Sequence, residues 1–135
     1  MHDRPTADEL LRAVELLLDD QLVPSLDGAR KYNARVAANV VRTVRRELAL
    51  EEKQLDAEWR GLDVLLGPVD RPPTLDVTRE ALRTRNTELS ERIHAGDADD
   101  GDFRALTLAH VRDTVHAKLE VSNPAWLTGS DTPDG

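Results

Sequence analysis

The chain has 135 residues, of which 39% are hydrophobic and 33% charged, and its formal net charge is −8. This length suits one domain whose core needs no disulfide or metal, and the composition is too apolar for a disordered chain. The absence of cysteine excludes disulfide frameworks and thiolate chemistry, and the acidic balance argues against a nucleic-acid partner.

The N-terminal residues 1–5 are charged and contain proline where a secretory signal would be apolar, and no later apolar run reaches membrane-spanning length. We therefore expect a cytoplasmic protein with no membrane partner. Thr6 and Glu9 have the spacing of a capping box, which predicts that a helix begins there. Its apolar stripe is Leu10, Leu11, Val14, Leu17 and Leu18. We expect the helix to end at Val23-Pro24, because proline disfavours helical geometry in the preceding residue.

A long helical pattern runs from about Ala29 toward Glu52. Every fourth residue along one side is apolar, namely Val36, Val40, Val44 and Leu48. A second stripe of Leu55, Trp59, Leu62, Leu65 and Leu66 continues until Gly67-Pro68, either in one bent helix or in a separate helix. Of these two we favour a break between the stripes, near residues 51–53. The proline-rich segment 67–73 is predicted to be a connecting loop.

Two further helices are expected in the C-terminal half. Asp76 or Thr78 can cap the first, whose inward residues are Leu82, Leu89 and Ile93 and which ends at Gly96. The second extends from about Phe103 to Val121, with the apolar stripe Leu108, Val111, Val115 and Leu119. Trp126 and Leu127 are expected to fold back as a small apolar plug.

No segment alternates polar and apolar residues between turn signals, so a sheet is not supported. We predict an all-α protein, an antiparallel bundle of four or five helices. It forms a single helical domain over residues 1–127, followed by a flexible C-terminal tail over residues 128–135.

Residues suited to catalysis occur without the context that catalysis needs. The seven glycines do not cluster into a phosphate-binding loop, and His110 and His116 fall on roughly opposite sides of a helix. The acidic segment 97–102 departs from the calcium-loop pattern at its glycine position and at its twelfth position. We therefore expect a non-enzyme with no catalytic residue, cofactor or metal. The alternative is a small enzyme that uses a carboxylate pair among Glu15, Asp19 and Asp20.

The long helix carries basic residues and no acidic residue between positions 30 and 46. At 100° per residue, five polar side chains fall roughly opposite the valine stripe. They are Lys31, Arg35, Asn39, Arg42 and Arg46, which we call the basic stripe. The stripe is a candidate partner-binding surface for anions or carboxylates. In the alternative interpretation, acidic residues of the first helix neutralise it internally, and the Asn39 amide makes a structural hydrogen bond.

Three sets of segments, in this order, resemble an uncharacterised bacterial family, domain of unknown function 6285. They are residues 2–7 with 9–11, 34–40 with 46–48, and 111–115 with 118–119, 123–124 and 127. Members of that family are typically encoded beside aminoglycoside-phosphotransferase-like kinases and acyl-CoA dehydrogenases. The resemblance therefore implies an accessory subunit of such a phosphotransferase-like kinase.

The pathway that the resemblance implies is the breakdown of short hydroxy or keto acids as CoA thioesters, in which the kinase phosphorylates the hydroxyl group. No catalytic residue is implied for the chain itself. The alternative from the residues alone is a helical scaffold that binds a small anion or CoA, or that associates with itself as a homo-oligomer.

Overall fold

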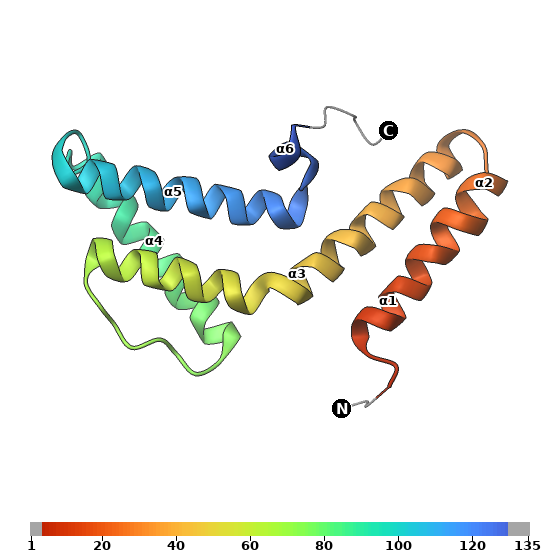
Figure 1. Cartoon of the computed structure of the whole chain (residues 1–135), viewed down its shortest axis with the longest axis horizontal. Coiled ribbons are helices and arrows are strands. Elements are labelled where there is room, and N and C mark those ends of the chain that lie inside the picture. Colours follow the sequence, from red (N-terminus) through yellow and green to blue (C-terminus); the bar gives the residue numbers. More distant parts are fainter. Residues whose placement is uncertain (1–3, 130–135) are drawn as a thin grey trace. The chain divides into compact units, whose positions relative to one another are not determined.

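The computed structural model describes residues 4–129, and all regular elements within this range are helices (Figure 1). The all-α bundle class predicted from the sequence is confirmed. The described residues divide into two compact units. Unit 1 covers those within Met1–Leu50 and Glu120–Gly135, and unit 2 is Glu51–Leu119.

The single domain expected over residues 1–127 stays a prediction. Residues 130–135 of the predicted tail lie outside the described part. Of the helices within residues 4–129, none combines the length and apolar character that a membrane crossing requires.

Unit 1 begins with the predicted capping box. The Thr6 hydroxyl accepts from the Glu9 backbone N–H at 3.2 Å, and a Glu9 carboxylate oxygen accepts from the Thr6 N–H at 2.7 Å. Helix α1 spans Ala7–Leu16, a π-helical segment η1 covers Leu17–Leu22, and α2 covers Val23–Ser25. The helical run therefore continues through the proline at which we expected it to stop.

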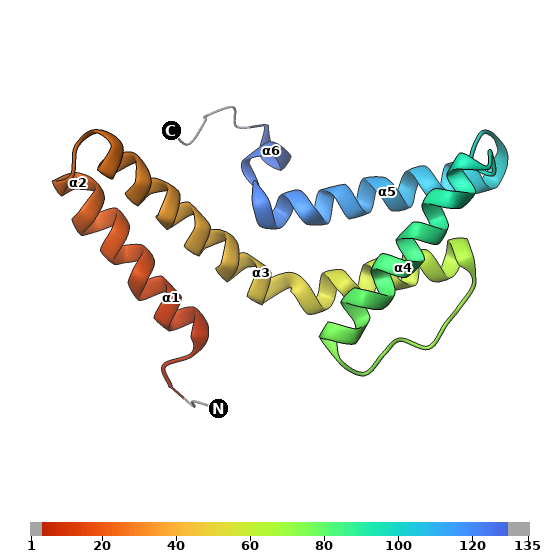
Figure 2. The ribbon, with the colours of Figure 1, turned by 180° about the vertical axis from the view of Figure 1, so that it is seen from behind.

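Helix α3 spans Gly28–Leu66, so the break expected near residues 51–53 is wrong. The residues around that point, Leu50 to Gln54, all favour helix, and none is glycine or proline. The predicted end is confirmed, because Gly67 takes a left-handed backbone with φ of 98° and Pro68 follows it. The two views in Figure 1 and Figure 2 show α1 beside the first half of α3.

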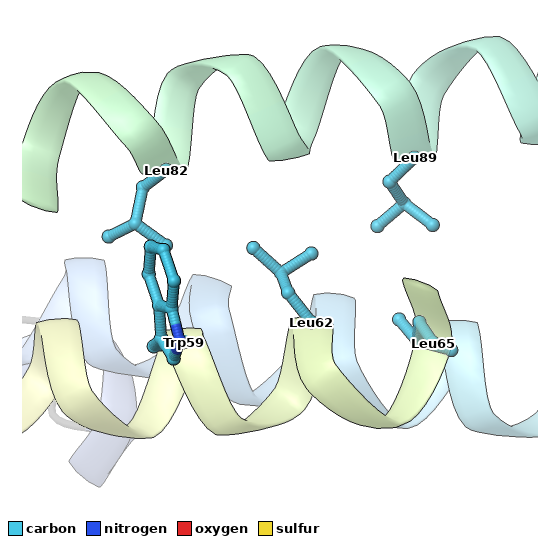
Figure 3. Packing of buried hydrophobic residues seen from close by; sticks show 5 residues of the cluster. All are labelled: Trp59, Leu62, Leu65, Leu82 and Leu89. Atoms are coloured by element: carbon cyan, nitrogen blue, oxygen red, sulfur yellow. The ribbon is translucent and has the colours of Figure 1, made fainter. Parts of the chain in front are cut away.

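Unit 2 is built from the second half of α3, from α4 (Leu75–His94) and from most of α5 (Gly101–Ser122). Its core consists of Trp59, Leu62, Leu65, Leu82 and Leu89. Figure 3 shows Trp59 below Leu82, and Leu65 below Leu89. In these two pairs, the later residue of α3 faces the later residue of α4, so the two helices run parallel. Loop 67–74 carries the chain back between them.

Helix α5 runs antiparallel to α3. The Gln54 side-chain amide donates to the Ala117 carbonyl at 3.0 Å, while Gly61, further along α3, lies against His110, which is earlier in α5. Among the described residues of α5, Thr107 and His110 are the buried ones. The predicted stripe of α5 is wrong as a buried face, because Leu108, Val111 and Val115 are exposed.

Helix α4 differs from its prediction at its start. Leu82 and Leu89 are buried as expected, although Ile93 is exposed. The helix begins at Leu75 after Thr74, rather than after Asp76 or Thr78. Thr78 is not a cap because it is buried inside the helix, where its hydroxyl donates back to the Thr74 carbonyl at 2.7 Å. The end at Gly96 is confirmed, since the Gly96 N–H donates to the Ile93 carbonyl at 3.1 Å.

Unit 1 buries little apolar surface. Among its described residues only Ala34 and Ala38 are buried, and the valine stripe from Val36 to Leu48 is exposed. The short helix α6 (Ala125–Thr128) follows α5, and its Trp126 is 74% exposed. The plug expected from Trp126 is therefore wrong, because the side chain that should fill it faces solvent.

Candidate docking surface

Ion pairs from α1 and η1 to α3 occupy part of the basic stripe. The Arg42 Nε donates to Glu15 Oε1 at 3.0 Å, and a second nitrogen of Arg42 contacts Asp19. Arg45 donates to Glu15 Oε2 at 2.6 Å and to Asp8 Oδ1 at 2.7 Å. We call these five residues the ionic ladder. The ladder shows that the alternative of internal neutralisation holds for Arg42.

Two of the ladder carboxylates, Asp8 and Glu15, are held in their charged forms. Burial raises the pKa of Glu15, but the hydrogen bond from Arg45 and the charges of Arg42 and Arg45 outweigh it, so the net pKa is lowered. The hydrogen bond from Arg45 lowers the pKa of Asp8, and Asp8 and Glu15 in turn raise the pKa of Arg45. The positive charges of Arg42 and Arg45 are therefore paired with carboxylates within unit 1.

Two more members of the basic stripe have internal partners. A nitrogen of Arg42 donates to the Asn39 side-chain oxygen at 2.6 Å, which confirms the structural hydrogen bond expected for Asn39. The Arg46 Nε donates to the Val121 carbonyl at 2.7 Å, near the C-terminal end of α5. A cation at that position also suits the negative end of the helix dipole. Asn39, Arg42 and Arg46 thus serve the architecture of unit 1.

Lys31 and Arg35 are different. Arg35 is exposed and Lys31 is half-buried, and neither makes a hydrogen bond or ion pair with another residue between positions 4 and 129. They lie one turn apart, so they share one face of α3. Tyr32, three residues before Arg35, is 65% exposed. We call Lys31, Tyr32 and Arg35 the basic patch, and it is the part of the predicted site that stays available.

The position of the patch is unfavourable for the helix itself. Lys31 is close to the N-terminus of α3, where the helix dipole is positive, and the first turn has no acidic residue. A cation at such a site typically costs about 0.3–1 kcal/mol. Helix stability therefore does not explain why a basic side chain is placed there.

Sequence reasoning missed a second arginine site, which lies in unit 2. Arg85 is buried and donates to Asp63 Oδ1 and to the Gly67 carbonyl, both at 2.8 Å. Its guanidinium carbon lies 4.7 Å from the ring centroid of Trp59, whose indole N–H donates to the Val69 carbonyl at 3.0 Å. These contacts hold loop 67–74. The sequence did contain a signal for this site, because Arg85 lies between Leu82 and Leu89 on the inward side of α4.

The remaining candidates for chemistry do not gather into one site. Glu15 and Asp19 are paired with arginines, and Asp20 is exposed. Burial lowers the pKa of His110, although the charges of Glu58 and Asp113 oppose the shift. Within residues 4–129, no group of three or more histidine or carboxylate side chains is arranged to hold a metal ion.

A family model described as "Domain of unknown function" (DUF6285) matches residues 24–126. The matched range includes the basic patch and all of α3, whereas the acidic residues of the ionic ladder precede it. No curated protein and no solved structure matches the chain.

Proposed function

This chain belongs to the DUF6285 family, and from that premise we propose that it is a non-catalytic accessory subunit of an aminoglycoside-phosphotransferase-like kinase. The partner class and the pathway, breakdown of short hydroxy or keto acids as CoA thioesters, rest on the family resemblance. The observation that carries the proposed docking surface is the pair of cations without internal partners, Lys31 and Arg35.

The basic patch has the chemistry of a protein-docking surface. Arginine and tyrosine are enriched in interfaces, and both contribute strongly when they become buried there. The whole chain is acidic, so a local basic patch gives an acidic partner a preferred orientation during approach. We therefore expect Lys31 and Arg35 to contact carboxylates of the kinase.

The internal contacts restrict the proposed surface to fewer residues than the full basic stripe. Arg42 is held by Glu15 and Asp19, and Arg46 by the Val121 carbonyl. Reversing either charge would leave half-buried partners unpaired and would disturb unit 1 itself. A docking test must therefore use Lys31 and Arg35.

The experiment is co-expression with the phosphotransferase-like kinase that the family resemblance leads us to expect beside this chain, followed by pull-down and a kinase assay with and without the chain. We expect Lys31→Glu/Arg35→Glu to weaken the complex at least about tenfold, because like charges across an interface are costly. The melting temperature should not fall, since surface charge reversals alter stability little and an acidic side chain near the N-terminus of α3 suits the helix dipole. The matched control is Lys53→Glu, an exposed cation elsewhere on α3, which should bind as the wild type does.

Two results would contradict the proposal. A kinase that is fully active alone and never co-purifies with the chain would show that it is not the partner. A complex that tolerates Lys31→Glu/Arg35→Glu would show that the basic patch is not the docking surface, although the kinase would still be the partner. In the first case, calorimetry with CoA and dephospho-CoA would test the basic patch as an anion site.

A further inference from the structure

An apolar surface on unit 1 has no described residue covering it. It consists of Leu10, Val14 and Leu17 from the N-terminal helical run and Val40, Val44 and Leu48 from α3. These six side chains are between 37% and 57% exposed. We call them the apolar face.

Helical spacing and the ionic ladder together place the six residues on one side of the α1–α3 pair. Leu10, Val14 and Leu17 follow the three-and-four spacing of a single helix face. Val40, Val44 and Leu48 likewise recur every four residues. The ladder joins the acidic side of α1 to the basic side of α3. Arg42 is about 200° around the helix from Val40 and Val44. The apolar stripes of α1 and α3 therefore lie together on the side of the helix pair opposite the ionic ladder.

The apolar face has the composition of an interface centre. None of its six residues is charged, and its neighbours Ala37 and Val41 are apolar as well, while the exposed Glu47 lies at its edge. Depletion of charge is what distinguishes the buried centre of an interface from ordinary surface. On a chain with a net charge of −8, a neutral face is also a place where two copies can meet without repelling each other.

The size of the apolar face meets the requirement for a paired interface. Six half-exposed leucine and valine side chains present on the order of 500 Å², in the range of the largest patch on a typical monomer. Pairing two such faces would bury on the order of 1,000 Å² in total, which is about the minimum for a specific interface.

Among residues 4–129, no element of unit 1 buries this face. None of the residues of helix α1 is buried, although most of the stability of a helix in a protein comes from packing of its apolar face. We propose that the apolar face pairs with the same face of a second copy, so that two α1–α3 hairpins form a four-helix bundle. Such twofold pairing of one surface with itself is the commonest route to a homodimer, and it leaves both ionic ladders on the outside.

The test is the mass of the full chain in solution, measured by analytical ultracentrifugation over a range of concentrations. We expect the wild type to have twice the monomer mass of 15.0 kDa. Val14→Glu/Val40→Glu should weaken the dimer at least about a hundredfold, because each face would bury carboxylates without partners. Val64→Glu is the matched control, since Val64 is 66% exposed on α3 within unit 2, and it should remain a dimer.

A second measurement locates the interface without disturbing it. The chain has no cysteine, so Val44→Cys and Val64→Cys can each carry a single spin label. The label at position 44 should show a short distance between copies, and the label at position 64 a longer one. A wild type that stays monomeric at high micromolar concentration would overturn the proposal. A dimer that survives Val14→Glu/Val40→Glu, or that dissociates with Val64→Glu, would overturn it as well.

Discussion

At the scale of single residues, the contact between Gly61 and His110 determines how closely α3 and α5 approach. A Cβ atom at Gly61 would lie 2.8 Å from the His110 Cε1 and closer still to Nδ1. Glycine inside a helix costs about 1 kcal/mol relative to alanine, so this close approach offsets a real penalty. We predict that Gly61→Ala lowers the free energy of unfolding by about 1–3 kcal/mol, because the imidazole must move.

The same substitution gives the opposite result once the imidazole is removed. In a His110→Ala background, Gly61→Ala should raise the free energy of unfolding by about 1 kcal/mol, the difference in helix propensity. Urea unfolding followed by circular dichroism measures both backgrounds, and the sign change forms a double-mutant cycle. Equal destabilisation in both backgrounds would show that the contact with His110 is not the reason for glycine.

At the scale of helices, three of the ends could be predicted from the sequence, whereas the buried face of α5 could not. The ends at Thr6, Gly67 and Gly96 are set by local backbone chemistry, which a few adjacent residues specify. The buried face of α5 depends on its neighbours: Gly61 leaves room for His110, so the polar side of α5 turns inward and Val111 stays exposed.

The candidate site, too, could be predicted only in part from the sequence. The spacing of charges identified both the basic stripe and the acidic residues that could neutralise it. Spacing cannot decide between these two interpretations, because the choice depends on how α1 is rotated and shifted along α3. The contacts of Glu15 with Arg42 and Arg45 decide it for the ladder, and they leave Lys31 and Arg35 available.

The ionic ladder makes the pairing of α1 with α3 sensitive to acid. The pKa of Glu15 in the folded chain lies below its ordinary value of 4.5, so folding favours the ionised form. This stabilisation is complete above the ordinary pKa and is lost as the pH falls from about 4.5 through the folded pKa. We predict that α1 loses helicity over this range, as measured by the carbon chemical shifts of Ala13 and Leu16.

Substitution separates this effect from general acid unfolding. Glu15→Gln should flatten the pH profile of α1 and lower its helicity at neutral pH, because Arg42 and Arg45 lose a charged partner. Glu47→Gln, an exposed carboxyl on α3, should keep the wild-type profile. If Glu15→Gln also kept that profile, the ladder would not be the source of the acid sensitivity.

At the scale of the whole molecule, the two units differ in what stabilises them. Unit 2 has a continuous apolar core that includes Leu62 and Leu82, whereas the described buried residues of unit 1 are two alanines. Segments with few buried apolar contacts open at a lower free energy than core segments. Unit 1 should therefore exchange its backbone amide hydrogens faster than unit 2 when the chain is dilute.

This difference should depend on protein concentration if a second copy covers the apolar face. Pairing stabilises by mass action only the elements that it covers, so we predict that the amides of α1 and of residues 36–48 become more protected at higher concentration. The amides around Leu62 and Leu89 should not change. Hydrogen exchange followed by mass spectrometry, at concentrations below and above the dissociation constant of the dimer, measures both regions in one sample. Val14→Glu/Val40→Glu should abolish the concentration dependence in unit 1. An equal rise in protection over both units would instead mean that the copies associate through a different surface, because a dimer through the apolar face protects what it buries and leaves the core of unit 2 as it was.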